Sequence, residues 1–186
     1  MQISIPIMNT ITTHANLHGG GFEAGFYHPV LGVDHFLAMV AVGILSTQMG
    51  GRAIYIVPLT FIMIMFVGSL FGFLGITLVN DELGIALSVV LLGVAIAINK
   101  KFHILLGMGF VAFFAFFHGH AHGIEMPKIV SLLEYVSGFM LATLLLHIGG
   151  VIIGLVMQKV KTLEPILPHI GSAITGIGLY ILYNLF

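Results

Sequence analysis

The sequence contains no cysteine and no tryptophan, and only 7% of its 186 residues are charged. Without cysteine the chain forms no disulfides and no thiolate metal sites, so a bound metal has to be held by imidazole, carboxylate, carbonyl or thioether groups. A net charge of −1 and the lack of a Lys/Arg run argue against nucleic acid as a partner and against a polybasic lipid anchor. A soluble domain would carry about 25% charged residues.

Apolar residues dominate instead, at 59% of the chain with a mean hydropathy of +1.14. Long apolar runs cover 22–47, 54–79, 83–98, 104–117, 129–157 and 167–186. A helix of about 20 apolar residues crosses a bilayer. The sequence therefore predicts an all-α integral membrane protein, a bundle of six transmembrane helices formed by one domain over 22–186. Residues 1–21 are expected to be a flexible tail that contains His14 and His18.

The charged loops predict an orientation, because lysine and arginine concentrate on the cytoplasmic side of membrane proteins. The loops after the first, third and fifth runs hold five of the six basic residues, namely Arg52, Lys100, Lys101, Lys159 and Lys161. The opposite side has Lys128 with Glu23, Asp81, Glu82 and Glu125. Both termini are therefore expected on the outer, periplasmic side.

A first polar cluster, HPVLGVDH, places His28, Asp34 and His35 in the outer half of the first apolar run. Ionisable side chains at membrane depth are costly unless they are paired or liganded, which makes them functional candidates. Pro29 donates no backbone hydrogen bond and predicts a kink in the first helix. The two histidines are nearly in helical register, and Asp34 is either a ligand or an acceptor that fixes a histidine tautomer.

A second polar cluster, FHGHAHGIE, follows the fourth run. Helical spacing puts His118, His122 and Glu125 on one face and turns His120 away. The fourth helix returns to the outer side, so both clusters lie at similar depth, and the sequence predicts a metal site between the first and fourth helices. Imidazole and carboxylate ligands suit nickel, cobalt, copper(II) and zinc, so the ligand set alone does not identify the metal. The predicted ligands are His28, Asp34, His35, His118, His122 and Glu125.

The remaining ionisable residues in or near the membrane are weaker candidates. Glu134 lies near the outer end of the fifth run, and His147 lies deeper in the same run, where a relay role is conceivable. His120 belongs to the second cluster but faces another way. His14 and His18 of the tail could collect metal loosely.

HPVLGVDH continuing into FLAMVAVG, with FHGHAHGIE and the later LATLLLHIGG, resembles the HupE/UreJ family of bacterial nickel permeases. The resemblance runs from Gly21 over nearly the whole remaining chain. It implies uptake of nickel, or of cobalt, across the bacterial cytoplasmic membrane to supply hydrogenase or urease assembly. The family's functional positions match His28, Asp34, His35, His122 and Glu125. A cleaved signal peptide is also implied, although residues 1–11 lack the basic start of such a signal.

The residues alone leave two other functions open. One is a membrane-embedded zinc hydrolase with Asp34 or Glu125 as general base, and the other is a proton channel or sensor built on a His/Glu relay. We expect a transporter rather than an enzyme, without a prosthetic group, whose partners are Ni²⁺ or Co²⁺ as substrate and the lipid bilayer. The chain has no P-loop, so direct use of ATP would need a partner. Energy coupling, channel-like or alternating access, and assembly into a homo-oligomer stay open.

Overall fold

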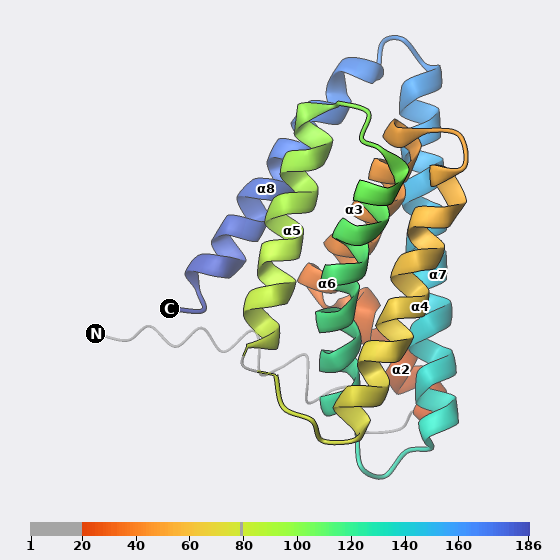
Figure 1. Cartoon of the computed structure of the whole chain (residues 1–186), viewed down its shortest axis with the longest axis vertical. Helices are drawn as coiled ribbons and strands as arrows, with labels where there is room; N and C mark the ends of the chain where they lie inside the picture. Colours follow the sequence, from red (N-terminus) through yellow and green to blue (C-terminus); the bar gives the residue numbers. More distant parts are fainter. Residues whose placement is uncertain (1–19, 79) are drawn as a thin grey trace.

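The computed structural model describes residues 20–78 and 80–186, and this part of the chain is entirely helical (Figure 1). The tail histidines His14 and His18 lie outside the described residues. The elements are α2 (Gly21–Leu31), α3 (Val33–Met49), α4 (Ala53–Phe73), α5 (Asp81–Ile98), α6 (Ile104–Ile124), α7 (Leu132–Lys159), the 3₁₀ turn η1 (Glu164–Ile166) and α8 (Leu167–Tyr183). The all-α prediction is confirmed for the described residues.

Four helices, α4 to α7, are long and apolar enough to cross a membrane, and α2 with α3 qualifies as a fifth span if the bent pair is counted as one. The last predicted run forms α8, which has only 17 residues. At 1.5 Å per residue it rises about 26 Å, short of the roughly 30 Å of a hydrocarbon core. The structure thus supports four to five candidate spans rather than the predicted six.

The first predicted span is broken into two helices that meet at an angle of 76°. The break lies at Gly32 and not at Pro29, which remains inside α2. Proline removes a single helical hydrogen bond, and the N–H of Gly32 still bonds to the carbonyl of His28 at 3.0 Å. Gly32 then becomes extended, and Asp34 accepts the backbone N–H of His35 in the first turn of α3. This side-chain contact satisfies one of the N–H groups left unpaired at a new helix start.

The helices pack as neighbours along their length, with α4 against α6, α5 against α8, and both α2 and α3 against α7. Glycine makes the closest contacts possible. A Cβ on Gly68 or Gly72 would collide with backbone carbonyls of α6, and one on Gly150 would collide with the carbonyl of Val40 in α3. These glycines are packing residues, and their close contacts fix the faces that α6 and α3 turn inward.

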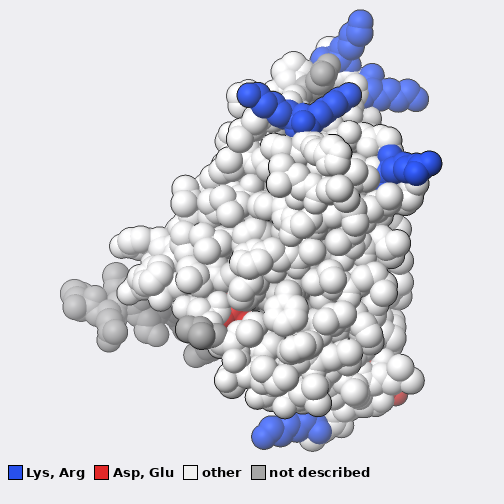
Figure 2. Space-filling view, viewed as in Figure 1, with Lys and Arg blue, Asp and Glu red and all other residues white. Residues whose placement is uncertain are grey.

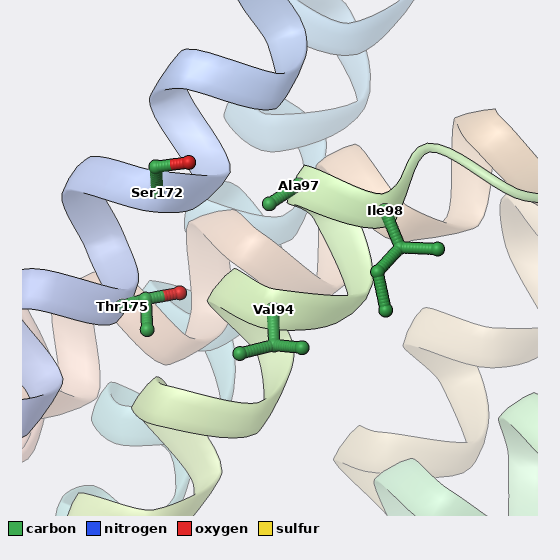
Figure 3. A pocket seen from close by; sticks show the side chains of 5 residues that line it. All are labelled: Val94, Ala97, Ile98, Ser172 and Thr175. Atoms are coloured by element: carbon green, nitrogen blue, oxygen red, sulfur yellow. The ribbon is translucent and has the colours of Figure 1, made fainter.

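The surface of the bundle matches a membrane environment. Large apolar side chains such as Leu59, Met63 and Phe113 are more than half exposed on the outer faces of the helices. Basic side chains gather at one end of the molecule (Figure 2), whereas Lys128 follows α6 at the opposite end. A hollow between α5 and α8 is lined by Val94, Ala97, Ile98, Ser172 and Thr175, and offers hydroxyls but no strong metal ligand (Figure 3).

Candidate metal site

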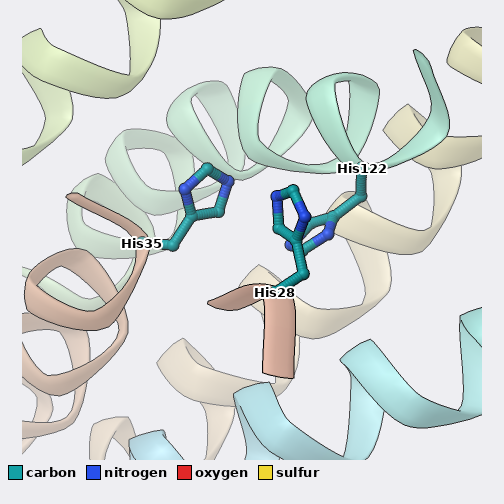
Figure 4. A group of neighbouring side chains, drawn as sticks. All are labelled: His28, His35 and His122. Carbon is teal, nitrogen blue, oxygen red and sulfur yellow. The ribbon is translucent and has the colours of Figure 1, made fainter. Parts of the chain in front are cut away.

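Three imidazoles from three helices converge in the half of the bundle opposite the basic end. His28 comes from the last turn of α2, His35 from the first turns of α3, and His122 from the end of α6 (Figure 4). One potential ligand nitrogen from each ring lies within 4.8 Å of the other two. Two imidazole nitrogens bound to one divalent ion at about 2.0–2.1 Å each are separated by roughly 3–4 Å, so small side-chain movements would close this histidine triad on a metal.

His35 is held by the carboxylate that precedes it. Its Nδ1 lies 2.9 Å from Oδ1 of Asp34, and its Nε2 is buried without a hydrogen-bond partner among the described residues. Because a carboxylate only accepts, Nδ1 carries the proton and Nε2 keeps its lone pair. Asp34 is therefore the acceptor that fixes the tautomer of His35, a contact that fits one of the two roles that the sequence left open for it.

His28 has an equivalent carboxylate partner in Glu125, the C-cap residue of α6, with 3.1 Å between Nε2 and Oε2. Burial acts to raise the pKa of the Glu125 carboxyl, but the hydrogen bond from His28 and the attraction of His28 and His35 outweigh it. The pKa of Glu125 accordingly lies below its usual range. Glu125 is an anion that orients His28 and ties α2 to the end of α6.

His122 has the least polar surroundings of the triad. Its ring is fully buried and stacks on Phe139 of α7, with centroids 4.6 Å apart and planes 13° from parallel. Neither of its nitrogens has a hydrogen-bond partner among the described residues. Buried polar atoms nearly always have a hydrogen-bond partner. An unpaired imidazole that lies next to the rings of His28 and His35 is therefore the arrangement expected of a metal ligand.

His118 lies one helical turn from His122 on the same face of α6, as predicted, and its ring centroid is 4.7 Å from that of His35. It is not part of the triad. Its Nε2 is 2.8 Å from the hydroxyl of Ser88 in α5, whereas Nδ1 has no partner in the described part of the chain. No pattern in the sequence marks Ser88, because a lone serine in an apolar run resembles any small packing residue.

His120 points to the other side of α6, as its spacing predicts. Its Nδ1 is 2.7 Å from Oδ2 of Asp81 at the start of α5, and its Nε2 contacts the carbonyl of Ile76. Both ring nitrogens of His120 thus already have oxygen partners within the protein. His120 fastens α6 to the start of α5 and to the segment between α4 and α5, and neither nitrogen is free for a metal.

The other predicted candidates lie elsewhere. Glu134 is exposed in the first turn of α7, beside the start of α2, and His147 is buried in the middle of α7. Glu82 was read from the sequence only as an outer charge, yet it lies within electrostatic range of Glu125, Asp34 and His35. Its position in the first turn of α5 could not be related to the site without knowing how α5 packs.

The end of the bundle that holds the triad is also its acidic end. Six of the seven acidic residues lie there, in the first turn of a helix or at its C-cap: Glu23, Asp34, Asp81, Glu82, Glu125 and Glu134. Clustered negative charge raises the local concentration of cations. The site therefore combines an anionic approach with imidazole lone pairs, which together suit a divalent transition-metal ion.

Comparison with known proteins assigns the chain. The sequence profile of the family described as "HupE / UreJ protein" matches residues 4–181. "Protein HupE" of Rhizobium leguminosarum bv. viciae is 44% identical over 138 residues, which cover 74% of this chain and 72% of that protein. No solved structure matches the chain. The profile match over nearly the whole sequence, together with this relative, shows that the chain belongs to the HupE/UreJ family of membrane metal transporters, which are not enzymes.

Proposed function

We propose that this protein is an uptake permease that carries Ni²⁺, with Co²⁺ as the alternative substrate, across the bacterial cytoplasmic membrane. The observation that carries the proposal is the convergence of His28, His35 and His122, whose ligand nitrogens lie within 4.8 Å of one another. Family membership supports a metal ion as substrate. The imported ion would supply the assembly of nickel enzymes such as hydrogenase or urease, as the sequence resemblance implies.

The charge distribution supports an orientation for this transport. Basic side chains gather at one end of the bundle (Figure 2), and the helix bounds place Arg52 after α3, the Lys100–Lys101 pair after α5, and Lys159 and Lys161 at the end of α7, away from the triad. We place that end in the cytoplasm, because basic residues are retained there, and the triad near the outer face. In this orientation α2 begins and α8 ends in the outer half (Figure 1).

The residues of the site divide the work of taking up the ion. The acidic end attracts the hydrated cation, and water is exchanged for the lone pairs of the triad. Asp34 and Glu125 hold His35 and His28 in the tautomers that present those lone pairs. Since the three ligands come from three helices, movement of α2 against α3 at Gly32 would change the number of ligands and release the ion inward.

The test is influx of nickel, cobalt and zinc into proteoliposomes that contain the wild-type protein or His35→Ala. We expect saturable nickel influx that His35→Ala abolishes, because the substitution removes a buried ligand and leaves Asp34 unpaired. His169→Ala serves as the matched control, since His169 is exposed at the start of α8, away from the triad.

Two outcomes would contradict the permease. Nickel that binds to the wild type but never crosses would point to a sensor. Proton current in metal-free buffer, unaffected by nickel, would favour the His/Glu relay. The zinc hydrolase considered from the residues is set aside, because the family consists of transporters.

A further inference from the structure

A second set of unpaired imidazole nitrogens lies deeper in the bundle than the triad. His118 and His147 are buried to within 1% of full burial. Nδ1 of His118 and both ring nitrogens of His147 have no hydrogen-bond partner among the described residues. Buried polar groups without partners are rare enough in folded proteins that each calls for a ligand or a role.

The tautomer of His118 follows from its hydrogen bonds. The hydroxyl of Ser88 donates its single proton to the carbonyl of Ile85 at 2.6 Å, as serines in helices commonly do. The 2.8 Å contact between Ser88 Oγ and His118 Nε2 must therefore be donated by the imidazole. The proton of His118 is on Nε2, and Nδ1 presents a lone pair next to the ring of His35.

Helical rise places His118 and His147 at two successive depths below the triad. His118 precedes His122 by one turn of α6, which places it about 6 Å closer to the basic end. Phe139 stacks on His122, and His147 lies eight residues further along α7, about 12 Å closer to the basic end. The ring of Phe61 is in contact with both inner histidines, at centroid distances of 5.5 Å from His118 and 5.2 Å from His147.

A thioether sulfur lies one turn of α7 from the level of His147. Thr143 lies one turn before His147 on the same face of α7, and its hydroxyl is 3.7 Å from Sδ of Met65 in α4. Thr143, Met65 and Phe61 are all fully buried. Imidazole and thioether are both neutral groups that ligate transition metals, imidazole suiting nickel and thioether suiting softer ions.

We propose that His118 and His147 form an inner relay for the transported cation, in which His118 Nδ1 takes the ion from the triad and His147 receives it on the way to the cytoplasmic side. The inference rests on the proposed transport function and adds a second binding position to it. Ser88 acts as a positioning residue, because it fixes the tautomer of His118.

The absence of cysteine in the chain makes a direct test possible. His147→Cys would introduce the only thiol, at the proposed inner position, and nickel bound to a thiolate shows charge-transfer absorption that nickel bound to imidazole lacks. We expect this absorption when purified His147→Cys is loaded with NiCl₂. His169→Cys, with its thiol exposed at the start of α8, is the matched control and should not show it.

A flux measurement accompanies the spectroscopy. His147→Ala is expected to lower nickel influx at least tenfold while the equilibrium affinity of the triad for nickel stays at the wild-type value, which also shows that the variant is folded. Wild-type influx in His147→Ala, or no thiolate absorption in a His147→Cys protein whose triad still binds nickel, would overturn the relay. Absence of nickel binding by the wild type would overturn the proposed transport itself.

Discussion

His118 and His120 are two residues apart on α6, and both rings are fully buried, yet they face opposite environments. Both ring nitrogens of His120 are hydrogen-bonded to oxygens, one to the Asp81 carboxylate and one to the carbonyl of Ile76. His118 gives one nitrogen to Ser88 and keeps the other unpaired beside His35. Burial alone therefore does not identify a metal ligand in this protein. The number of ring nitrogens left without a protein partner separates the two faces of α6.

The largest difference between the two faces of α6 is expected when one imidazole is removed from each. His122→Ala deletes one of three converging imidazoles, so its nickel affinity should fall at least about 100-fold, more than the loss of an orienting partner. His120→Ala should change the affinity of the folded protein by less than about threefold, because both of its ring nitrogens already have oxygen partners away from the triad. Titration calorimetry on the purified variants measures both. Equal losses in the two variants would show that the faces are not separate.

External pH should affect only the ligand face of α6, because protons compete with nickel for the imidazole nitrogens. A ligand imidazole must be neutral to bind metal, and the ordinary pKa of histidine is about 6.5. Glu125 has a lowered pKa and therefore stays ionised from pH 7.5 to pH 5.5, so the imidazoles are the groups that gain protons. Lowering the pH over this range should reduce nickel influx at least about tenfold for a single competing proton.

The control for this measurement is the same titration in His120→Ala, which should give the same pH profile as the wild type. The membrane potential is clamped so that only the outer pH changes. Influx that stays constant down to pH 5.5 would contradict histidine ligation at the outer face.

The periodicity of the sequence was sufficient to predict much of the site. The three-and-four spacing placed His118 and His122 on one face of α6 and His120 on another, and the helix continues through Gly119 and Gly123 as that spacing requires. The positions of His28 and His35 in the first span also predicted their meeting with His122. The facial placement is a property of a single helix, and it survives because each apolar run is long enough to specify its helix. The meeting of His28 and His35 with His122 was instead predicted from the order and direction of the helices.

The features that the sequence did not predict are the position of the helix break and the side-chain contacts between particular helices. Pro29 was expected to mark the kink, but the break occurs at Gly32, where the backbone is extended. The new helix begins at Val33, and the Asp34 side chain accepts a backbone hydrogen bond in its first turn. Ser88 and Phe139 reach the histidines from α5 and α7, and no pattern in their own runs sets them apart from other packing residues. The last apolar run, 167–186, is longer than the 17-residue helix α8 that it forms, so run length alone overstates the length of this helix.

The smallest effect on transport is expected from the pair on the far face of α6. Asp81→Asn removes the anionic acceptor of His120, and loss of a hydrogen bond between buried charged or polar groups costs about 1–3 kcal/mol. We therefore expect a lower unfolding temperature in detergent, while nickel influx per folded molecule stays within about twofold of the wild type. Glu134→Gln makes the same chemical change at an exposed position and should leave stability unchanged. If Asp81→Asn lost influx at unchanged stability, the His120–Asp81 pair would belong to the ion path, and the division of α6 into a ligand face and a structural face would be wrong.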